Sequence, residues 1–492
     1  MNEAIKKYKW AKVLSGLLLV TVINVLFAQT KQDNEMMKNR IDNYLNQSVD
    51  QGFSGAMLIY RKGEVILNKG YGYANKAKKL NNTPDTVFDV GSVSKQFTAA
   101  AILKLEQQNK LNVEDTLSKF FKDLPEDKKH ISIHQLLIHS SGFINGIGKN
   151  DFDHIPLNDY FTKLFATKLL HIPGSKHMYS NAGYSILARI IEIVSGESYE
   201  SYLNQNLFKP AGMKYTGYLL PKWENLNLAH GYSYNVLDTG SMAARYKTDG
   251  KISRVLLGNG GINSTQNDMF LWYKALQTEK VLSRELVKKL TTPYIIEFEG
   301  ETSYYAYGWV VFKSPRNTDM IAHDGSNGTF FYDFRWFPKE EVLVLYASNS
   351  LTSKVGGMAW RIDKMLFDDS YQPKPIQEDF VTTLLRFSEN HNGNLSQLVF
   401  NMKNQFKKQL DKPFYLSRLS GTYLRNNRFD KAEAIAILNI ELFPNDSNIW
   451  DSLGQIYFDQ GKLKKALKAY KKAVSIDTQN DYAREMINKI EG

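Results

Sequence analysis

Residues 88–108, FDVGSVSKQFTAAAILKLEQQ, hold the pattern from which the architecture of this chain can be inferred. The sequence after Gly91 is predicted to be helical, and Ser92 and Lys95, three residues apart, then share one face of the helix. A lysine amine that burial keeps neutral can accept the proton of a neighbouring hydroxyl and so activate it as a nucleophile. Lysine is abundant in the chain, so this spacing also arises by chance and needs support from other residues.

The composition indicates a large globular protein without thiol chemistry. A length of 492 residues predicts two or three domains, and 43% hydrophobic residues are typical of globular proteins. There is no cysteine, which excludes disulfides, cysteine nucleophiles and cysteine-ligated metals. The nine histidines show no HExxH-like spacing, so neither a metal nor another cofactor is expected. Despite the net charge of +11, lysines alternate with acidic residues, and nucleic-acid binding is not expected.

The N-terminus has the layout of a secretory signal. Lysines at positions 6, 7, 9 and 12 precede an apolar stretch from Val13 to Phe27, which Ala28 follows. Residues 1–28 are therefore predicted to be a signal peptide, and the protein to be exported to the periplasm or out of the cell. The alternative is an uncleaved single-pass anchor, although Asn24 interrupts a stretch that is short for a membrane span.

Strand patterns lie at both ends of residues 29–367, and helical patterns fill the middle. An early hairpin is predicted from residues 56–60 and 65–67, and a late hairpin from residues 329–337 and 342–347. This order differs from a regular alternation of strands and helices. It predicts an α+β fold, in which an antiparallel sheet of N- and C-terminal strands is flanked by a helical region.

The middle region also contains a conspicuous glycine-rich stretch. Helices are expected before it, at residues 34–49, 131–138 and 182–194, and residues 88–108 carry the serine motif into another helix. Residues 258–261, Gly-Asn-Gly-Gly, predict a tight turn that leads into another helix, with Ser264 or Thr265 as its N-cap. The stretch lacks the Gly-Lys-Ser/Thr element of a phosphate loop, so nucleotide binding is not expected.

The C-terminal part is predicted to be a separate helical domain. Residues 368–379, which are polar and interrupted by prolines, are expected to form a linker to a domain at 380–492. That domain contains the 34-residue tetratricopeptide (TPR) pattern at residues 413–446 and 447–480. Such repeats often bind peptides in a concave groove, so a protein partner is one interpretation. The other is that the repeats only pack against the first domain or extend it.

Two polar motifs follow the serine and lysine. Tyr179 and Asn181 precede a predicted apolar helix, where a phenol can shuttle a proton and an amide can bind a carbonyl oxygen. His323 and Gly325 lie on one face of a predicted strand, and a glycine there allows a substrate to approach the backbone closely. Taken alone, each motif is also what an ordinary turn or strand end would show.

Together, S-x-x-K, Y-x-N and H-x-G in this order resemble the motifs of the serine β-lactamase and penicillin-binding-protein superfamily, and most of all its class C β-lactamase, D-peptidase and esterase group. The resemblance extends over residues 35–365 and includes ISIHQLLIHSSGF, HIPGSKHMYSNAGYSILARIIE, GNGGINSTQNDM and HDGSNGTFFYDFRWFP. It implies a β-lactamase/DD-peptidase-like fold for residues 29–367, and a serine hydrolase activity on a small-molecule or peptide substrate.

The resemblance also implies a role for each motif residue. Ser92 would be the nucleophile and Lys95 its proton acceptor, while Tyr179 would shuttle protons to the leaving group. Asn181 would bind the substrate amide, and the backbone amides of Ser92 and Ser326 would form the oxyanion hole. The resemblance leaves open whether Lys95 or Tyr179 is the true base.

One residue departs from the β-lactamase pattern. β-Lactamases of this group usually have lysine at the position of His323, where a permanent cation binds the substrate carboxylate, whereas an imidazole is mostly neutral at pH 7. Family members with histidine there include D-peptidases and esterases, so hydrolysis of a peptide, amide or ester is expected ahead of efficient β-lactam hydrolysis.

Two further interpretations of the function stand beside hydrolysis. In the first, the protein binds a penicillin or a cell-wall fragment with little turnover and signals through the TPR repeats. In the second, the repeats do the work and the first domain is vestigial.

Overall fold

The computed structural model describes residues 30–492 apart from residues 149 and 225, so the predicted signal peptide lies outside the described residues. The chain forms two compact units. The first comprises the described residues up to His230, together with Gly240–Asn349 and Val355–Ile376. The second comprises Gly231–Thr239, Ser350–Lys354 and Gln377–Gly492. Within the described part of the chain, no helix is both long enough and apolar enough to cross a membrane.

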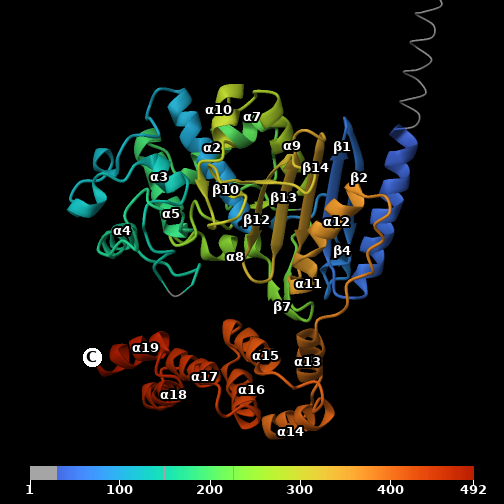
Figure 1. The fold of residues 1–492 in the computed structure, drawn as a ribbon, viewed down its shortest axis with the longest axis vertical. Helices are drawn as coiled ribbons and strands as arrows, with labels where there is room; N and C mark the ends of the chain where they lie inside the picture. Colours follow the sequence, from blue (N-terminus) through green and yellow to red (C-terminus); the bar gives the residue numbers. More distant parts are fainter. Residues whose placement is uncertain (1–29, 149, 225) are drawn as a thin grey trace, which may run out of the picture. The chain divides into compact units, whose positions relative to one another are not determined.

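The first unit is built around an eight-stranded antiparallel sheet with the strand order β2-β1-β14-β13-β12-β11-β10-β9 (Figure 1). Its strands are β1 (Gly55–Arg61), β2 (Glu64–Tyr71), β9 (Ile295–Ile296), β10 (Ser303–Tyr305), β11 (Val310–Lys313), β12 (Asp319–Ser326), β13 (Phe331–Phe337) and β14 (Val342–Ser348). β1 lies beside β14, in a register that runs from Gly55 opposite Ser348 to Arg61 opposite Val342. The prediction of a sheet made by both ends of the domain is therefore confirmed.

Both predicted hairpins are present in the sheet. In the turn between β1 and β2, Lys62 and Gly63 both have positive φ values, of 47° and 91°, which suits a tight hairpin turn. β13 and β14 are buried along their whole length, because helices cover both faces of the sheet. On one face, the hydroxyl of Tyr346 donates to the carbonyl of Val355, at the start of the C-terminal helices of this unit. The alternation along β14 therefore divides its side chains between two packed layers.

The helical region follows the β1–β2 hairpin and precedes β9. Its helices are α2 (Ser94–Gln107), α3 (Ile133–Leu137), α4 (Leu157–Phe165), α5 (Asn181–Ser195), α6 (Tyr199–Leu203), α7 (Lys209–Ala211), α8 (Met242–Asp249), α9 (Gln266–Gln277) and α10 (Arg284–Leu290). α2 and α5 pack against each other in the core, and residues 94–103 of α2 are all buried. The opposite face of the sheet is covered by the helix at residues 30–49 and by α11 (Ser353–Gly356) and α12 (Met358–Phe367), as Figure 1 shows.

Local structure differs from the sequence expectation at two helix starts. The segment Gly91–Val93 forms a 3₁₀ turn, and the α-helix begins only at Ser94. The helix predicted at 131–138 is shorter, because the side chain of Ser132 caps it by accepting from Gln135. The N-cap predicted at Ser264 or Thr265 is Thr265, whose side chain accepts from the backbone amide of Asp268.

The second unit is mainly helical. Its helices are α13 (Phe380–Glu389), α14 (Leu395–Gln405), α15 (Pro413–Arg425), α16 (Phe429–Leu442), α17 (Ser447–Asp459), α18 (Leu463–Ile476) and α19 (Asp481–Glu491). α15–α16 and α17–α18 are helix pairs that lie in the two stretches where the repeats are predicted. A Cβ on Gly454 of α17 would lie 2.7 Å from the Tyr470 ring of α18, so glycine is what allows these helices to pack closely. The hairpin at residues 231–239 contributes Leu237 to the same hydrophobic core.

Candidate active site

Ser92 and Lys95 lie at the junction of the 3₁₀ turn and α2. The Lys95 Nζ is 3.1 Å from the Ser92 Oγ, and it donates to the Oδ1 of Asn181 at 2.7 Å and to the carbonyl oxygen of Asn259 at 2.6 Å. Lys95 is fully buried, and burial lowers the pKa of its amine well below the usual value. A neutral amine has two hydrogens and one lone pair. Because the two carbonyl oxygens can only accept, the lone pair is left for the Ser92 hydroxyl.

Tyr179 lies near this pair, in the segment that leads into α5. The Lys95 Nζ is 4.7 Å from the centre of the Tyr179 ring, and the Tyr179 hydroxyl is near enough to the Ser92 side chain to interact with it. Burial raises the pKa of Tyr179 above its usual value. The phenol therefore stays protonated at neutral pH and can donate a proton, whereas Lys95 is the group that is ready to accept one.

The segment that holds Tyr179 and Asn181 is fixed by a histidine that the sequence interpretation missed. His139 is fully buried, and its ring lies 4.2 Å from the Tyr179 ring. Its Nδ1 accepts from the backbone amide of Ser180 at 3.1 Å, and its carbonyl oxygen accepts from that of Met178 at 2.8 Å. His139 has a φ of 56°, a left-handed conformation that is uncommon for residues other than glycine. The only sequence signal for this residue was its place in the HSSG stretch.

The end of strand β12 approaches the nucleophile closely, backbone against backbone. A Cβ on Gly325 would lie 2.3 Å from the Val90 carbonyl oxygen and 2.4 Å from the Ser92 nitrogen. A Cβ on Gly91, which has a φ of 52°, would lie 2.6 Å from the Ser326 nitrogen. Glycine was expected at 325 for the approach of a substrate, but here the chain itself requires it. This contact brings the backbone amides of Ser92 and Ser326, the expected oxyanion-hole donors, to the same place.

Asp89 ties the two sides of this contact together. Its carboxylate accepts from the Gly91 backbone amide at 2.6 Å and from the Asn327 side-chain amide at 3.0 Å. The carboxylate is buried, and burial raises its pKa to about 6. Asp89, like Asn259, was not among the residues expected at the site. Neither role could be recognised from the sequence. Asp89 holds two backbone segments together through hydrogen bonds, and Asn259 contributes a backbone carbonyl that any residue could supply.

His323 lies on β12, two residues before Gly325, and is uncharged at neutral pH. Its Nδ1 donates to the carbonyl oxygen of Asp324 at 2.6 Å, so its Nε2 accepts from the Tyr305 hydroxyl at 3.0 Å. Burial lowers the pKa of His323 to about 4. Both nitrogens are therefore satisfied in the neutral ring, and the residue supplies no cation for a substrate carboxylate.

A cleft opens at Ser92. Ser92, Asn181 and Ser326 all line it, together with the turn at residues 259–261. Because the Oδ1 of Asn181 is engaged by Lys95, its amide nitrogen is the group left to donate to a substrate carbonyl. The structure thus brings together Ser92, Lys95, Tyr179, Asn181, His323, Gly325 and Ser326, all seven residues singled out from the sequence.

Comparison with known proteins identifies the fold. The model of the Beta-lactamase family matches residues 38–364, and a TPR repeat model matches residues 454–485. The chain belongs to the β-lactamase family. It is a serine hydrolase of this family, with a β-lactamase-like domain of mixed α+β structure and C-terminal TPR helices.

Relatives of this β-lactamase-family chain have varied names. It is 35% identical over 291 residues to the putative penicillin-binding protein PbpX of Bacillus subtilis, covering 57% of this chain and 68% of the relative. It is 31% identical over 276 residues to the teichoic acid D-alanine hydrolase of Staphylococcus aureus, covering 55% and 64%. The penicillin-binding protein homologue of Pyrococcus abyssi, an octamer, has 25% identity and a TM-score of 0.56, covering 72% of this chain and 81% of that one. The chain spans about two thirds of the two curated relatives' lengths.

Proposed function

We propose that the protein is an exported serine hydrolase that forms an acyl-enzyme at Ser92 and cleaves a peptide, amide or ester in preference to a β-lactam. The observation that carries the proposal is the hydrogen-bond arrangement of Lys95. Two carbonyl oxygens accept the hydrogens of the neutral amine, so that its lone pair faces Ser92. Few structural roles would need a buried, uncharged lysine in contact with a serine at the base of a cleft.

Acylation begins with the Ser92 hydroxyl. As its Oγ attacks the substrate carbonyl carbon, its proton passes to the Lys95 Nζ, and the carbonyl oxygen becomes an oxyanion. In this mechanism the backbone amides of Ser92 and Ser326 donate to that oxyanion, and each such donor contributes about 3 kcal/mol in the transition state. The Asn181 amide nitrogen positions the substrate in the cleft.

Collapse of the intermediate requires a proton for the leaving group. Tyr179 donates its phenolic proton to the leaving nitrogen or oxygen, and the proton that Lys95 took from Ser92 then passes to the Tyr179 oxygen, which restores the phenol and the neutral amine. The products of this step are the free amine or alcohol and the Ser92 ester. Water then attacks the ester, with its proton taken by the same pair of residues, and releases the acid.

The preference against β-lactams rests on His323. Penicillins and cephalosporins carry a carboxylate, and the neutral imidazole, with both nitrogens in hydrogen bonds, supplies no positive charge for it. Relatives named as penicillin-binding proteins and as a teichoic acid D-alanine hydrolase support acyl chemistry of this broad kind. Neither name decides the substrate of this chain.

The test is an activity panel with the purified protein and its Ser92→Ala variant. Nitrocefin, a p-nitrophenyl ester and a D-amino-acid amide are assayed side by side, and Ser92-dependent turnover of the ester or amide is expected to exceed that of nitrocefin. Fast nitrocefin turnover without the other activities would reverse the preference. A long-lived adduct without turnover would favour the binding and sensing alternative.

Export and a partner for the TPR helices are part of the proposal. The basic and apolar pattern of residues 1–28 supports export, and cell fractionation with detection of the N-terminus of the mature protein tests it. The match of a TPR repeat model supports a protein partner. Crosslinking in intact cells, with and without residues 380–492, tests whether a partner binds there.

A further inference from the structure

The cleft at Ser92 receives one part of the substrate, and its lining residues indicate which part. Asn181 and the turn at residues 259–261 line it, whereas Tyr179 and His323 are not among the described residues that do. In the proposed mechanism, Tyr179 gives its proton to the leaving group. The leaving group therefore departs on the Tyr179 side, and the cleft holds the acyl part of the substrate.

The cleft is small and partly apolar. Its volume is about 50 Å³, and Phe152, Met242 and Leu256 contribute apolar side chains to its wall. One water molecule requires about 10–15 Å³ of such volume, so the cleft has room for only a few heavy atoms. An acyl group about the size of alanyl fits this volume, whereas a bulky acyl group does not.

Asp151 places an unpaired carboxylate in this cleft. Asp89 and Asp151 are the charged residues among the described residues that line it. The Asp89 carboxylate is already engaged by the backbone amide of Gly91 and the side-chain amide of Asn327. The Asp151 side chain forms no hydrogen bond or ion pair with any residue that the structure describes. The cleft therefore contains a negative charge that no cation of the chain balances.

The segment that carries Asp151 is anchored beside the cleft. The Ser253 hydroxyl donates to the backbone carbonyl of Asp153 at 2.6 Å. The guanidinium of Arg245 lies over the Phe152 ring, 3.3 Å from the ring centre. These contacts, made by the two residues that follow Asp151, hold the carboxylate at the cleft and engage the neighbouring guanidinium elsewhere.

The surroundings of Asp151 favour a cationic group on the ligand. Partial burial in the cleft raises the pKa of the Asp151 carboxyl, and the Lys95 side chain is near enough to act on that pKa in the opposite direction. Burial keeps the Lys95 amine neutral, so it does not compensate the carboxylate. An unpaired and partly desolvated carboxylate gains a charge-assisted hydrogen bond from an ammonium group that enters the cleft.

We propose that Asp151 selects substrates whose acyl group is a small amino acid with a free α-ammonium group, which the carboxylate binds. The proposal rests on the proposed function, since it names the acyl group of that reaction. Ser92 forms an ester with the aminoacyl carbonyl carbon as the bond to the leaving amine or alcohol breaks, and water then releases the free amino acid. The same requirement disfavours penicillins, whose acyl part is larger and carries an acylated, uncharged nitrogen.

The test uses two anilides that differ in one group. Alanine p-nitroanilide carries an ammonium on its α-carbon, and isobutyric acid p-nitroanilide carries a neutral methyl group in the same place. At pH 7 the ratio of their kcat/KM values, taken with the faster alanine enantiomer, is expected to favour alanine by about tenfold or more. Asp151→Asn should lower this ratio about tenfold. Asp159→Asn is the matched control, because it removes an exposed carboxylate in the first turn of α4 that does not line the cleft, and the ratio should stay unchanged.

The outcomes separate this proposal from the proposed function. A ratio at or below one, or a ratio that Asp151→Asn leaves unchanged, overturns the role of Asp151 even when Ser92-dependent hydrolysis is intact. If neither anilide is hydrolysed, binding of alaninamide and of isobutyramide to the full-length Ser92→Ala protein is compared by ligand-observed NMR. Preferential binding of alaninamide that Asp151→Asn weakens about tenfold supports the role, and equal or absent binding of the two amides overturns it.

Discussion

The ring of His139 lies 4.2 Å from the ring of Tyr179, and the same histidine accepts from the backbone amide of the next residue, Ser180. This histidine is held at a φ of 56°, which costs about 1–2 kcal/mol for a residue with a Cβ. Because the strained residue contacts the catalytic segment, we infer that it positions Tyr179 for proton transfer.

His139→Asn tests this positioning role. Asparagine tolerates a positive φ, so the backbone is preserved while the imidazole ring is lost. We expect kcat to fall by about 10–100-fold with little change in KM, because the proton donor is displaced and the cleft is retained. Steady-state kinetics measure both constants. A kcat equal to that of the wild type would contradict the role. A rise in KM alone would indicate that the substitution weakens substrate binding in the cleft.

Lys95→Arg tests whether a neutral amine is the base. A guanidinium stays charged at every accessible pH, so acylation should fall by about 10²–10⁴-fold. In the wild type, the active form is the unprotonated amine, and activity is therefore lost as the pH falls through the pKa of Lys95. Because burial lowers that pKa well below its usual value, the activity should already be developed at neutral pH. A pH–rate profile of kcat/KM whose acid limb lies near pH 10 would contradict this assignment.

Tyr179→Phe separates the role of proton donor from that of base. p-Nitrophenolate can leave as an anion without a proton, whereas the nitrogen of an amide must be protonated before it leaves. The variant should therefore lose about 10²–10⁴-fold of acylation with an amide substrate and much less with a p-nitrophenyl ester. Single-turnover acylation rates for both substrates give the comparison. Equal losses for the two substrates would show that Tyr179 instead removes the proton of Ser92.

Gly325→Ala should disrupt the oxyanion hole. The new Cβ would meet backbone atoms at 2.3 and 2.4 Å, so β12 and the 3₁₀ turn must move apart. We expect a loss of at least about 100-fold in acylation, the scale of one oxyanion-hole donor. Gly146→Ala is the control, because a Cβ there meets no atom within 4 Å. Wild-type acylation by the Gly325→Ala variant would show that β12 can move away from the 3₁₀ turn without disrupting the oxyanion hole.

The motif residues of the site and the elements that carry them could be predicted from the sequence, because each motif lies at a distinctive place in the fold. Ser92 and Lys95 are joined by one turn of backbone, and Tyr179 immediately precedes the helix that packs on α2. The two hairpins were readable from their alternating strands and turn residues. The pairing of the two ends of the domain in one sheet followed from placing strands at both ends, whereas the order of all eight strands did not.

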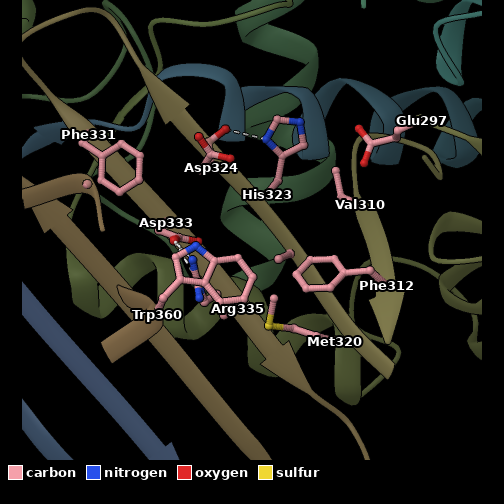
Figure 2. Close-up of a pocket in the computed structure, with 12 residues that line it drawn as sticks. Glu297, Val310, Phe312, Met320, His323, Asp324, Phe331, Asp333, Arg335 and Trp360 are labelled. Atoms are coloured by element: carbon pink, nitrogen blue, oxygen red, sulfur yellow. Dashed lines mark hydrogen bonds and ion pairs between the residues drawn. The ribbon is translucent and has the colours of Figure 1, made fainter. Parts of the chain in front are cut away.

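What could not be predicted depends on long-range contacts of ordinary residues. Asn259 acts through its backbone carbonyl, which carries no mark in the sequence. Asp89 and His139 act by holding other groups, and neither residue type signals such a role. A cavity on β12, which Figure 2 shows, joins residues from the end of β9, from β11 to β13 and from α12, and no spacing in the sequence brings these together.

The central claim is that Ser92 is a nucleophile activated by a neutral lysine. The most direct measurement is intact and peptide mass spectrometry of the full-length protein after reaction with a fluorophosphonate probe at neutral pH. The account predicts one adduct per chain, located on the peptide that contains Ser92, absent in Ser92→Ala and formed at least about 100-fold more slowly in Lys95→Arg. An unlabelled wild-type protein, or equal labelling of the Ser92→Ala variant, would contradict it.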